Sequence, residues 1–400
     1  MLNAYIYDGA RTAFGKYCGS LAAVRPDDLA ASVIKALVEG NDFNPALIDD
    51  VILGCVCQSG EDSRNIARYA SLLAGLPVEV SAQTVNRLCA SSLSAILDAA
   101  RAISCGEGNV YIAGGVESMT RAPLTFNKSN TAYSKDINIY DSAIGVRFPN
   151  QVFGKLYGHE SMPETAENVA KAENISREAS DKFAYQSQKK WADATANGYF
   201  KDDIIAINIP QKRGKADTVV DTDEHPRPNT TADKMASMNS LLDGGVVTAA
   251  NASGLNDGAV AVLMGNKAFG EQHHLKPIAR VLGGASAGVE PSLMGLGPVP
   301  ASQKVLKRLG LTLAQMDVIE INEAFAAQVL GDLKQLGLAS DDPRINPNGG
   351  AIAVGHPLGA SGARIALSAA RQLQRTGGRY ALITMCIGVG QGLAVVIERT

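Results

Sequence analysis

The sequence predicts an α/β protein made of two similar halves. Short apolar segments that read as strands alternate with helical segments over most of the 400 residues, which is the pattern of a parallel sheet with helices on both faces. Forty glycines indicate many tight turns and close backbone approaches. A repeat at a fixed offset of 270 residues indicates that the two halves arose by duplication.

The first part of the chain alternates regularly between strands and helices. Pro26 and Asp27 suit the first turn of a helix, which we expect over residues 26–38. An extended segment at residues 85–88 leads into a helix at 90–103. The remaining expected elements are strands at 5–7, 50–54 and 110–115, and a helix at about 63–73.

Residues 119–247 differ in character, because they are polar, rich in Asn, Lys and Asp, and carry two charged amphipathic helices near 165–172 and 177–197. This stretch is typical of an insertion. Regular alternation resumes at residue 260, with elements expected at 277–284, 301–309 and 318–321. The predicted divisions are an N-terminal half of residues 1–118 plus about 248–268, an inserted domain of residues 119–247, and a C-terminal half of residues 269–400.

The repeat is visible residue by residue. A shift of 270 places residues 89–92 on 359–362, residues 99–101 on 369–371, and the strand at 110–116 on 380–386. Both copies read as turn, helix and strand in register. Duplication is the simplest explanation, and chance similarity of two βαβ units is the alternative. Two such halves would place their sheets side by side, with helices between them.

Composition favours a soluble globular enzyme. The chain is 46% hydrophobic and 19% charged, and it is longer than a single core usually organises. A net charge of −3 without a Lys/Arg run disfavours nucleic-acid binding. No basic or apolar leader and no membrane-spanning stretch are evident, so we expect a cytoplasmic protein without membrane partners. Six cysteines are too few for a disulfide framework, and we expect mostly buried thiols and no bound metal.

Cys89 is the first candidate for chemistry, because an extended segment meets a helix at this residue. Free N–H groups and the helix dipole at such a place lower the pKa of a thiol, and the thiolate is the nucleophile. The alternative is a small buried core residue.

His356 lies in a glycine-dense loop that enters the equivalent helix of the second half, and Pro357 fixes the backbone behind it. Such a loop holds an imidazole in a defined place, where it can take the proton of a thiol. The alternative is a histidine that serves the turn alone.

Two further candidates lie at strand ends, where α/β sheets bind ligands. Cys386 ends an apolar strand before a glycine turn, and a thiol there can give and accept a proton; taken alone, a structural thiol is the better interpretation. Asn322 follows the strand at 318–321, and its amide can hold a water or an oxyanion, whereas its common role is to cap a helix.

The remaining candidates are binding residues. The loop at residues 251–259 is polar and contains glycine, which suits an amide-rich ligand, although as a motif it is weak. Arg227 and Lys234 are cations of the kind that bind phosphates, although the ordinary interpretation of each is a solvated surface charge.

Together these segments resemble the thiolase family over essentially the whole chain. The resemblance implies a five-layered αβαβα fold of two duplicated halves, with an inserted loop domain that covers coenzyme A. It also implies coenzyme A as a co-substrate, no permanently bound cofactor, and a homotetramer. The matching segments, in family order, are the Cys89 segment, residues 114–119, the loop at 251, residues 322–325, the loop at 355–357 and the end at 386–388.

The same resemblance implies a role for each candidate. Cys89 is the nucleophile that becomes acylated, His356 activates it, and Cys386 exchanges the proton on the α-carbon of acetyl-coenzyme A. One oxyanion site falls on His356 with a water held by Asn322. The other falls on the backbone N–H groups of Cys89 and Gly388. By the resemblance, Ser253 touches the pantetheine chain, Arg227 faces the nucleotide end and Met162 lies in the pocket loop. With the cation Lys234, these are the residues predicted to bind coenzyme A.

Within the family, the chain resembles most the branch that cleaves 3-oxoadipyl-coenzyme A to succinyl- and acetyl-coenzyme A. The likeness rests on residues 1–25, 162–168 and 221–228 and on the tail through residue 392. Ser92 and Ala250 stand where relatives commonly have glycine, so packing under Cys89 and in the 251 loop is expected to differ slightly. Arg147 and His159 are the candidates to meet the substrate carboxylate.

Three alternatives to this activity stay open. The first is a general acetyl-coenzyme A acetyltransferase, which acts on the acetoacetyl thioester. The second is a decarboxylating condensing synthase, which also uses Cys, His and Asn. The third is a non-catalytic lipid- or coenzyme-binding module.

Overall fold

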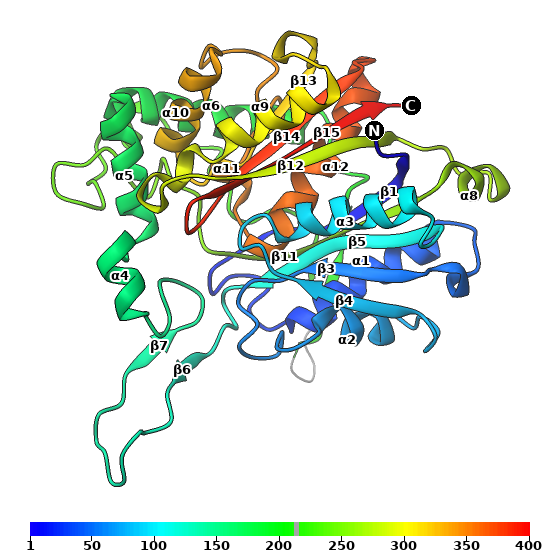
Figure 1. Ribbon diagram of the computed structural model, residues 1–400, viewed down its shortest axis with the longest axis horizontal. Coiled ribbons are helices and arrows are strands. Elements are labelled where there is room, and N and C mark those ends of the chain that lie inside the picture. The colour runs from blue at the N-terminus through cyan, green and yellow to red at the C-terminus, as the bar shows by residue number, and fades with distance from the viewer. Residues whose placement is uncertain (212–215) are drawn as a thin grey trace.

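The computed structural model describes residues 1–211 and 216–400 (Figure 1). Within this part of the chain, most strands join one sheet of eleven, in the order β13-β14-β15-β12-β1-β11-β5-β3-β4, with β2 and β8 paired beside it. Its strands are β1 (Ala4–Thr12), β2 (Gly15–Lys16), β3 (Asp50–Gly54), β4 (Ser81–Val85), β5 (Val110–Ser118), β8 (Ile204–Ile205), β11 (Asn256–Gly265), β12 (Ala279–Gly288), β13 (Val318–Ile321), β14 (Tyr380–Ile387) and β15 (Gln391–Arg399).

The strand order confirms the predicted duplication. Reading outward from the centre, β1-β11-β5-β3 of the first half matches β12-β15-β14-β13 of the second. The strand directions match as well: each half has two antiparallel pairings followed by one parallel pairing. The halves join where β1 runs antiparallel to β12 over residues 4–6. Helices α3 (Ser91–Cys105) and α12 (Leu358–Thr376) are the repeated helices of the 270-residue offset.

The predicted parallel sheet is wrong in detail, because the sheet is mixed. Parallel pairings occur between β3 and its neighbours β4 and β5, and between β13 and β14, while β1, β11, β12 and β15 pair antiparallel along the sheet. The alternating pattern of strand and helix holds only for the outer part of each half. The central strands are joined by a turn or by the long insertion, and these connections allow reversal of direction.

The elements form five layers, which Figure 1 shows nearly edge-on. Strands β1, β11, β5, β3 and β4 of the first half are called the first sheet below, and strands β12, β15, β14 and β13 of the second half the second sheet; the two are continuous through β1 and β12. Helices α1 (Pro26–Gly40) and α2 (Ile66–Leu73) cover the outer face of the first sheet. Helices α3 and α12 lie between the sheets and contact strands of both halves. The outer face of the second sheet is covered by α9 (Pro298–Leu309) and α10 (Ala326–Leu336). Three large apolar clusters fill the spaces between these layers.

Among the residues that the structure describes, one helical segment, Leu88–Cys105, is long and apolar enough by composition to cross a membrane, which corrects the expectation that no segment is. The physical reason is its place in the fold. Helix α3 packs against α12 and against strands of both sheets, so it is apolar on most of its surface. These contacts are those of a helix in the core of a protein.

The insertion contributes an arm and a set of helices. Strands β6 (Leu124–Phe126) and β7 (Ile139–Asp141) pair to form an arm that projects from the body (Figure 1). The two predicted helices are present as α5 (Met162–Glu173) and α6 (Arg177–Ala196). The remaining named elements are α4 (Gln151–Tyr157), α7 (Ala232–Ala236), β9 (Ile207–Ile209), β10 (Thr218–Val220), α8 (Lys267–Gln272) and α11 (Ala351–Val354).

Candidate active site

Cys89 lies at the turn between β4 and α3, as the sequence predicts. The preceding residue, Leu88, has a left-handed backbone with φ of 47°, which is uncommon for a residue with a branched side chain. The turn is held by two side chains: Asn86 Oδ1 accepts from the N–H of Leu88 at 2.9 Å, and Ser91 Oγ accepts from the N–H of Arg87 at 2.9 Å. The sulfur is therefore presented at the first turn of α3 by a constrained backbone.

The pKa of the Cys89 thiol is raised, contrary to the expectation of a lowered one. Burial is the largest cause, and the backbone N–H groups of Gly388 and of Cys89 itself act in the opposite direction. Burial outweighs these donors because the charged form loses the solvation of water. The free thiol is therefore protonated at neutral pH and needs a base to become a nucleophile.

The two halves bring the Cys89 and His356 segments to one place through close backbone contacts. A side chain at Gly54, the last residue of β3, would meet the backbone of Ser91 and Ser92 at the start of α3. A side chain at Gly359, at the start of α12, would meet the backbone of Gly54 and Val116. Both helix starts thus converge on the end of β3. Ser92 Oγ also accepts from the N–H of Ala363 at 2.9 Å, which is how the structure accommodates serine at this position.

His356 is held by its backbone and by one ring nitrogen. Gly355 has φ of 103°, which favours glycine, and the N–H of His356 donates to Asn256 Oδ1 at 2.9 Å. Nδ1 lies 2.6 Å from Ser361 Oγ, and that hydroxyl donates to the carbonyl of Pro357 at 2.9 Å. Because the hydroxyl proton is used, Oγ accepts from Nδ1–H, and this assigns the lone pair to Nε2.

Burial lowers the pKa of His356 to about 3, with a smaller contribution from the charge of Arg364. The imidazole is therefore neutral at physiological pH, and its Nε2 is ready to accept a proton. A buried neutral imidazole and a protonated thiol, on segments that close backbone contacts bring together, are the groups needed for a general base and its nucleophile.

Asn322 lies 3.4 Å from His356 Nε2 through its Nδ2. It does not cap a helix, because α10 begins four residues later with Phe325 at its N-cap. The side chain is fully buried, and within residues 1–211 and 216–400 its Oδ1 has no hydrogen-bond partner. The two groups that the resemblance assigns to one oxyanion site are thus neighbours.

Cys386 lies on β14, two residues before Gly388, in a buried apolar cluster with Phe325, Met294 and Ala252. Burial raises the pKa of this thiol well above its usual range, and the charge of Cys89 raises it further. The two sulfurs are therefore within electrostatic reach of each other. A Cβ atom added at Gly388 would lie 3.5 Å from Leu88 Cδ1. The turn that contains Gly388 therefore lies beside the turn that carries Cys89.

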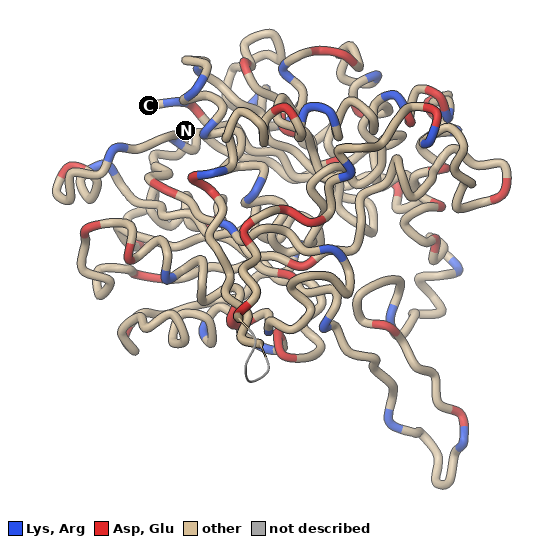
Figure 2. The backbone as a smooth tube through the Cα atoms, turned by 180° about the vertical axis from the view of Figure 1, so that it is seen from behind, with Lys and Arg blue, Asp and Glu red and all other residues tan. Residues whose placement is uncertain are grey.

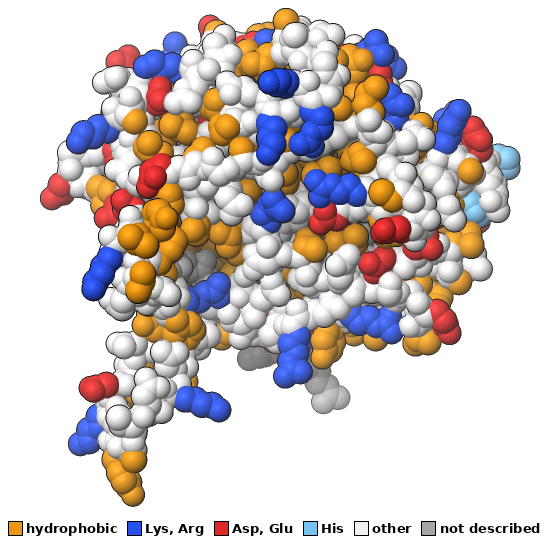
Figure 3. Space-filling view, in the orientation of Figure 1, with side chains coloured by type: hydrophobic (Ala, Val, Ile, Leu, Met, Phe, Trp, Pro, Cys, Tyr) orange, Lys and Arg blue, Asp and Glu red, His pale blue; other side chains and the backbone are white. Residues whose placement is uncertain are grey.

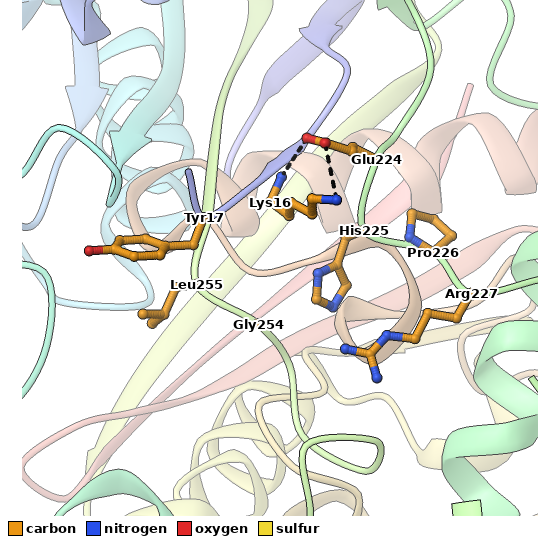
Figure 4. A pocket seen from close by; sticks show the side chains of 8 residues that line it. All are labelled: Lys16, Tyr17, Glu224, His225, Pro226, Arg227, Gly254 and Leu255. Atoms are coloured by element: carbon orange, nitrogen blue, oxygen red, sulfur yellow. Dashed lines mark hydrogen bonds and ion pairs between the residues drawn. The ribbon is translucent and has the colours of Figure 1, made fainter. Parts of the chain in front are cut away.

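The candidate binding residues Arg227 and Lys234 line two adjacent cavities. The first has a volume of about 500 Å³ and is shown in Figure 4; His225, Arg227 and Gly254 line it. The second, of about 400 Å³, is lined by Arg227 and Lys234 together with Met238 and Ala250. In the first cavity Lys16 pairs with Glu224 at 3.4 Å, whereas the Arg227 guanidinium has no ion pair within the described residues. A cation beside apolar walls suits the phosphate and base of a nucleotide.

Ser253 and Met162 lie near the apolar cluster that contains Cys386. The N–H of Ser253 donates to the carbonyl of Ala324 at 2.9 Å, beside the apolar cluster that contains Cys386, and Gly254 then lines the first cavity. Met162 begins α5 and is 40% exposed. Ala166, one turn later on the same helix face, belongs to the Cys386 cluster.

The two candidates for a carboxylate partner differ. His159 is exposed, stacks on Phe153 with ring centroids 5.7 Å apart, and bonds the carbonyl of Asn150 at 3.1 Å. Arg147 is half-buried and donates from Nη1 to the carbonyl of Cys57 at 2.9 Å and to Ser59 Oγ at 2.8 Å. Only Arg147 is therefore tied to the body of the protein near β3.

Sequence reasoning missed several residues that support this site. Asn256 and Ser361 hold His356, and His225 lines the first cavity, where burial and the charge of Arg227 lower its pKa to about 4. Asn256 lies inside the 251–259 loop, and Ser361 inside the segment aligned with Cys89 by the repeat. Asn256 is distant from His356 in the chain, and the contact of Ser361 with His356 depends on the geometry of the helix that both residues adjoin. The sequence therefore locates these residues without indicating that they hold His356.

Cys55, Asp62 and Glu117 form a buried group with the spacing of a metal site. Their acceptor atoms are occupied by the protein itself. Glu117 accepts from the N–H groups of Val56, Cys57 and Gly359, while Asp62 accepts from those of Gln58 and Gly60. Glu117 thus braces the start of α12 against the loop after β3. Of the six cysteines, Cys55, Cys57 and Cys386 are buried and Cys89 is partly buried, whereas Cys18 and Cys105 are exposed, so the expectation of buried thiols fails for these two.

The sequence matches the thiolase N-terminal domain over residues 4–268 and the thiolase C-terminal domain over residues 275–399. The chain belongs to the thiolase family. A β-ketoadipyl-CoA thiolase of Acinetobacter baylyi is 55% identical over the full length of both chains. The 3-oxoadipyl-CoA/3-oxo-5,6-dehydrosuberyl-CoA thiolase of Escherichia coli K12 is 52% identical, again over both full lengths.

Solved thiolase structures agree with this assignment. The crystal structure of human mitochondrial 3-ketoacyl-CoA thiolase in complex with CoA is 40% identical, with a TM-score of 0.92 over 100% of this chain and 98% of that chain. The fold is therefore the thiolase fold, and the protein is an acyltransferase that uses coenzyme A as a substrate.

Figure 2 shows acidic and basic residues interspersed along the backbone, without a large region of one charge.

Proposed function

We propose that this thiolase cleaves 3-oxoadipyl-CoA with coenzyme A to succinyl-CoA and acetyl-CoA. The supporting observation is the sequence identity of 52–55%, over the full length, to relatives named β-ketoadipyl-CoA thiolase and 3-oxoadipyl-CoA/3-oxo-5,6-dehydrosuberyl-CoA thiolase. The site offers a matching set of groups: a protonated thiol, a neutral imidazole, a second thiol and oxyanion donors. No group in this set requires a bound metal for the reaction.

In the first half-reaction, Cys89 Sγ attacks the 3-keto carbon while His356 Nε2 takes the thiol proton. The bond between carbons 2 and 3 then breaks, and its electron pair goes to carbon 2 of the departing acetyl-CoA. Cys386 donates its proton to that carbon, which leaves a succinyl thioester on Cys89. Charge on the attacked oxygen and on the thioester oxygen is stabilised by the N–H groups of Cys89 and Gly388 and by the side chain of Asn322 with His356.

In the second half-reaction, the thiolate of Cys386 takes the thiol proton of coenzyme A, and the coenzyme sulfur attacks the succinyl thioester. Cys89 leaves as a thiolate and recovers its proton from the His356 imidazolium. Each catalytic group returns to its starting state. The raised pKa of both cysteines favours this return, because each thiolate is readily reprotonated.

We propose that coenzyme A lies across the two cavities, with its pantetheine chain along Ser253 and its phosphates near Arg227 and Lys234. The test replaces each cation by glutamine, Arg227→Gln and Lys234→Gln, and measures KM for coenzyme A. The expected result is a raised KM with little change in kcat, since these residues are remote from the bond that breaks. An unchanged KM in both variants would contradict this placement.

Substrate choice is tested by comparing kcat/KM for cleavage of 3-oxoadipyl-CoA and acetoacetyl-CoA by the wild-type enzyme. Faster cleavage of 3-oxoadipyl-CoA supports the proposal. Faster cleavage of acetoacetyl-CoA overturns it in favour of a general acetyl-CoA acetyltransferase. Incubation with acetyl-CoA followed by mass spectrometry of the Cys89 peptide tests the binding-module alternative, which predicts no acetyl adduct.

We further propose a homotetramer in which the arm contacts a second copy of the chain. Its support is the set of apolar side chains that the arm exposes, among them Leu124, Phe126 and Ile139, each more than half exposed. Such side chains on a projecting hairpin are costly unless another surface covers them. Light scattering should give a tetramer for the wild type and a smaller species for Phe126→Asp; an unchanged mass would refute this contact.

A reducing compartment such as the cytoplasm is the location we propose. Its support is the chemistry of the site, because all six cysteines are free and the mechanism requires two of them as thiols. Fractionation of the source cells, with immunodetection of the protein in each fraction, tests the location. Recovery in an oxidising compartment would contradict it.

A further inference from the structure

Arg147 lies between β7 and α4, at the root of the arm, and is fastened to the loop that follows β3. Its Nη1 donates to the carbonyl of Cys57 and to Ser59 Oγ at 2.9 and 2.8 Å. These two bonds hold the cation against the body of the protein rather than leaving it free in solvent. Figure 3 shows a hollow between the arm side and the body, with hydrophobic side chains around it.

The loop under Arg147 is directly connected to the turn that carries Cys89. Asn86 Nδ2 donates to the carbonyl of Val56 at 3.2 Å, and the N–H of Cys55 donates to the carbonyl of Val85 at 3.2 Å. Cys57, which accepts from Arg147, therefore follows a segment bonded to the two residues that lead into the Cys89 turn. The guanidinium and the Cys89 turn are thus fastened to the same loop after β3.

The guanidinium has an unused edge. Within the described residues, its Nη1 makes the two hydrogen bonds to Cys57 and Ser59, while Nη2 and Nε make none and no carboxylate pairs with it. Other half-buried arginines of the region are neutralised, as Arg121 is by Glu61 at 2.5 and 2.6 Å. An unpaired, fixed guanidinium edge presents two parallel N–H donors, which is the arrangement that binds a carboxylate.

A purely structural role explains Arg147 less well. Its two acceptors are neutral oxygens, and a neutral amide side chain could brace them without the cost of partly desolvating an unpaired charge. Phe325, Met294 and Ala252 beside Cys386 are apolar, whereas the unpaired edge of Arg147 offers N–H donors to an anion.

We propose that Arg147 binds the terminal carboxylate of the 3-oxoadipyl substrate, and of the succinyl group on Cys89, through its free edge. This inference rests on the proposed function and adds the residue that sets its substrate class. It makes Arg147 a specificity-determining residue, which recognises acyl chains that end in an anion and leaves the chemistry at Cys89 unchanged.

The test measures kcat/KM of the wild type, Arg147→Gln and Arg147→Lys on 3-oxoadipyl-CoA, on its terminal methyl ester and on acetoacetyl-CoA. The glutamine variant is expected to lose on the order of 100-fold on the acid, and little on the two substrates without a carboxylate. The lysine variant, which keeps the charge without the planar fork, should fall between them. Arg121→Gln is the matched control, since it removes a paired cation, and it should change all three substrates alike.

Equal losses on all three substrates in the Arg147 variants would make the residue a structural brace and overturn the inference. Unchanged discrimination between the acid and its ester would overturn it as well. Failure of the proposed function is read separately, from the wild type alone: preference for acetoacetyl-CoA would remove the substrate class, whatever the variants do. Thermal unfolding of each variant shows whether a loss comes from misfolding, and the ratio between substrates is independent of the folded fraction.

Discussion

The hydroxyl of Ser361 is the group that fixes the tautomer of the His356 imidazole, the proposed general base. Its Oγ accepts from His356 Nδ1 at 2.6 Å and donates to the carbonyl of Pro357 at 2.9 Å. The substitution Ser361→Ala removes this acceptor and leaves a buried N–H without a partner, which costs about 1–3 kcal/mol. The ring can then relieve the cost by moving its proton to Nε2, the nitrogen that must take the proton from Cys89.

This cost can be converted to a rate. Each 1.4 kcal/mol of lost stabilisation is about a tenfold change, so acylation of Cys89 is expected to slow by about 10- to 100-fold. Binding of coenzyme A should change little, because Ser361 is fully buried and lines neither cavity. The effect therefore belongs in kcat rather than in KM.

The assay mixes enzyme rapidly with acetyl-CoA, quenches it, and quantifies the acetylated Cys89 peptide by mass spectrometry over time. Ser368→Ala is the matched control: the same substitution is made on the same helix, two turns later, where the side chain has no hydrogen bond to His356. The control should acylate at the wild-type rate. A Ser361→Ala enzyme that folds normally and acylates as fast as Ser368→Ala would refute the assigned tautomer.

Three further results are expected. Cys386→Ala should abolish exchange of the α-protons of acetyl-CoA, measured by NMR in deuterium oxide, while Cys89 is still acylated; a condensing synthase would be little affected, and retained exchange would contradict the assigned role. Burial raises the pKa of Glu117 to about 7, so this residue favours folding below pH 4.5 and the benefit is lost as the pH rises through 7. Glu117→Gln should therefore reduce the difference in unfolding free energy between pH 4.5 and pH 8 by about 3 kcal/mol in urea titrations, and an unchanged difference would count against the buried acid. Asp223→Asn removes the carboxylate that pairs with the buried Arg11 at 2.7 Å, so the variant should lose about 3 kcal/mol of unfolding free energy. It should also raise KM for coenzyme A, because Asp223 anchors the segment that walls the first cavity. A wild-type unfolding free energy together with a wild-type KM would refute this role of Asp223.

The sequence indicated the strongest elements of the fold because their signals are local. Amphipathic periodicity located α1, α5 and α6 to within a few residues, and the fixed 270-residue offset identified α3 and α12 as counterparts. The mixed direction of the sheet escaped prediction, since whether two strands run parallel depends on how the chain returns between them. The arm escaped as well, because its strands are three residues long and carry no period.

The site shows the same division. Cys89, His356, Cys386 and Asn322 were identified from their positions at turns and strand ends and from the family motifs they share. Their roles remain predictions, although the structure brings Asn322 to His356 and Gly388 to Cys89. The raised pKa of Cys89 was unpredictable, because it depends on how deeply the sulfur is buried.

By itself, therefore, the sequence determined the family and the duplicated α/β architecture, and it supplied the candidates for the reactive side chains. All of these depend on residue types and on spacings along the chain. Only the tertiary structure decided which ring nitrogen of His356 is free, that both cysteines are protonated at rest, and that Arg147 keeps an open edge. The physical reason is that protonation and pairing depend on burial and on partners such as Ser361 and Cys57, which folding alone brings into contact.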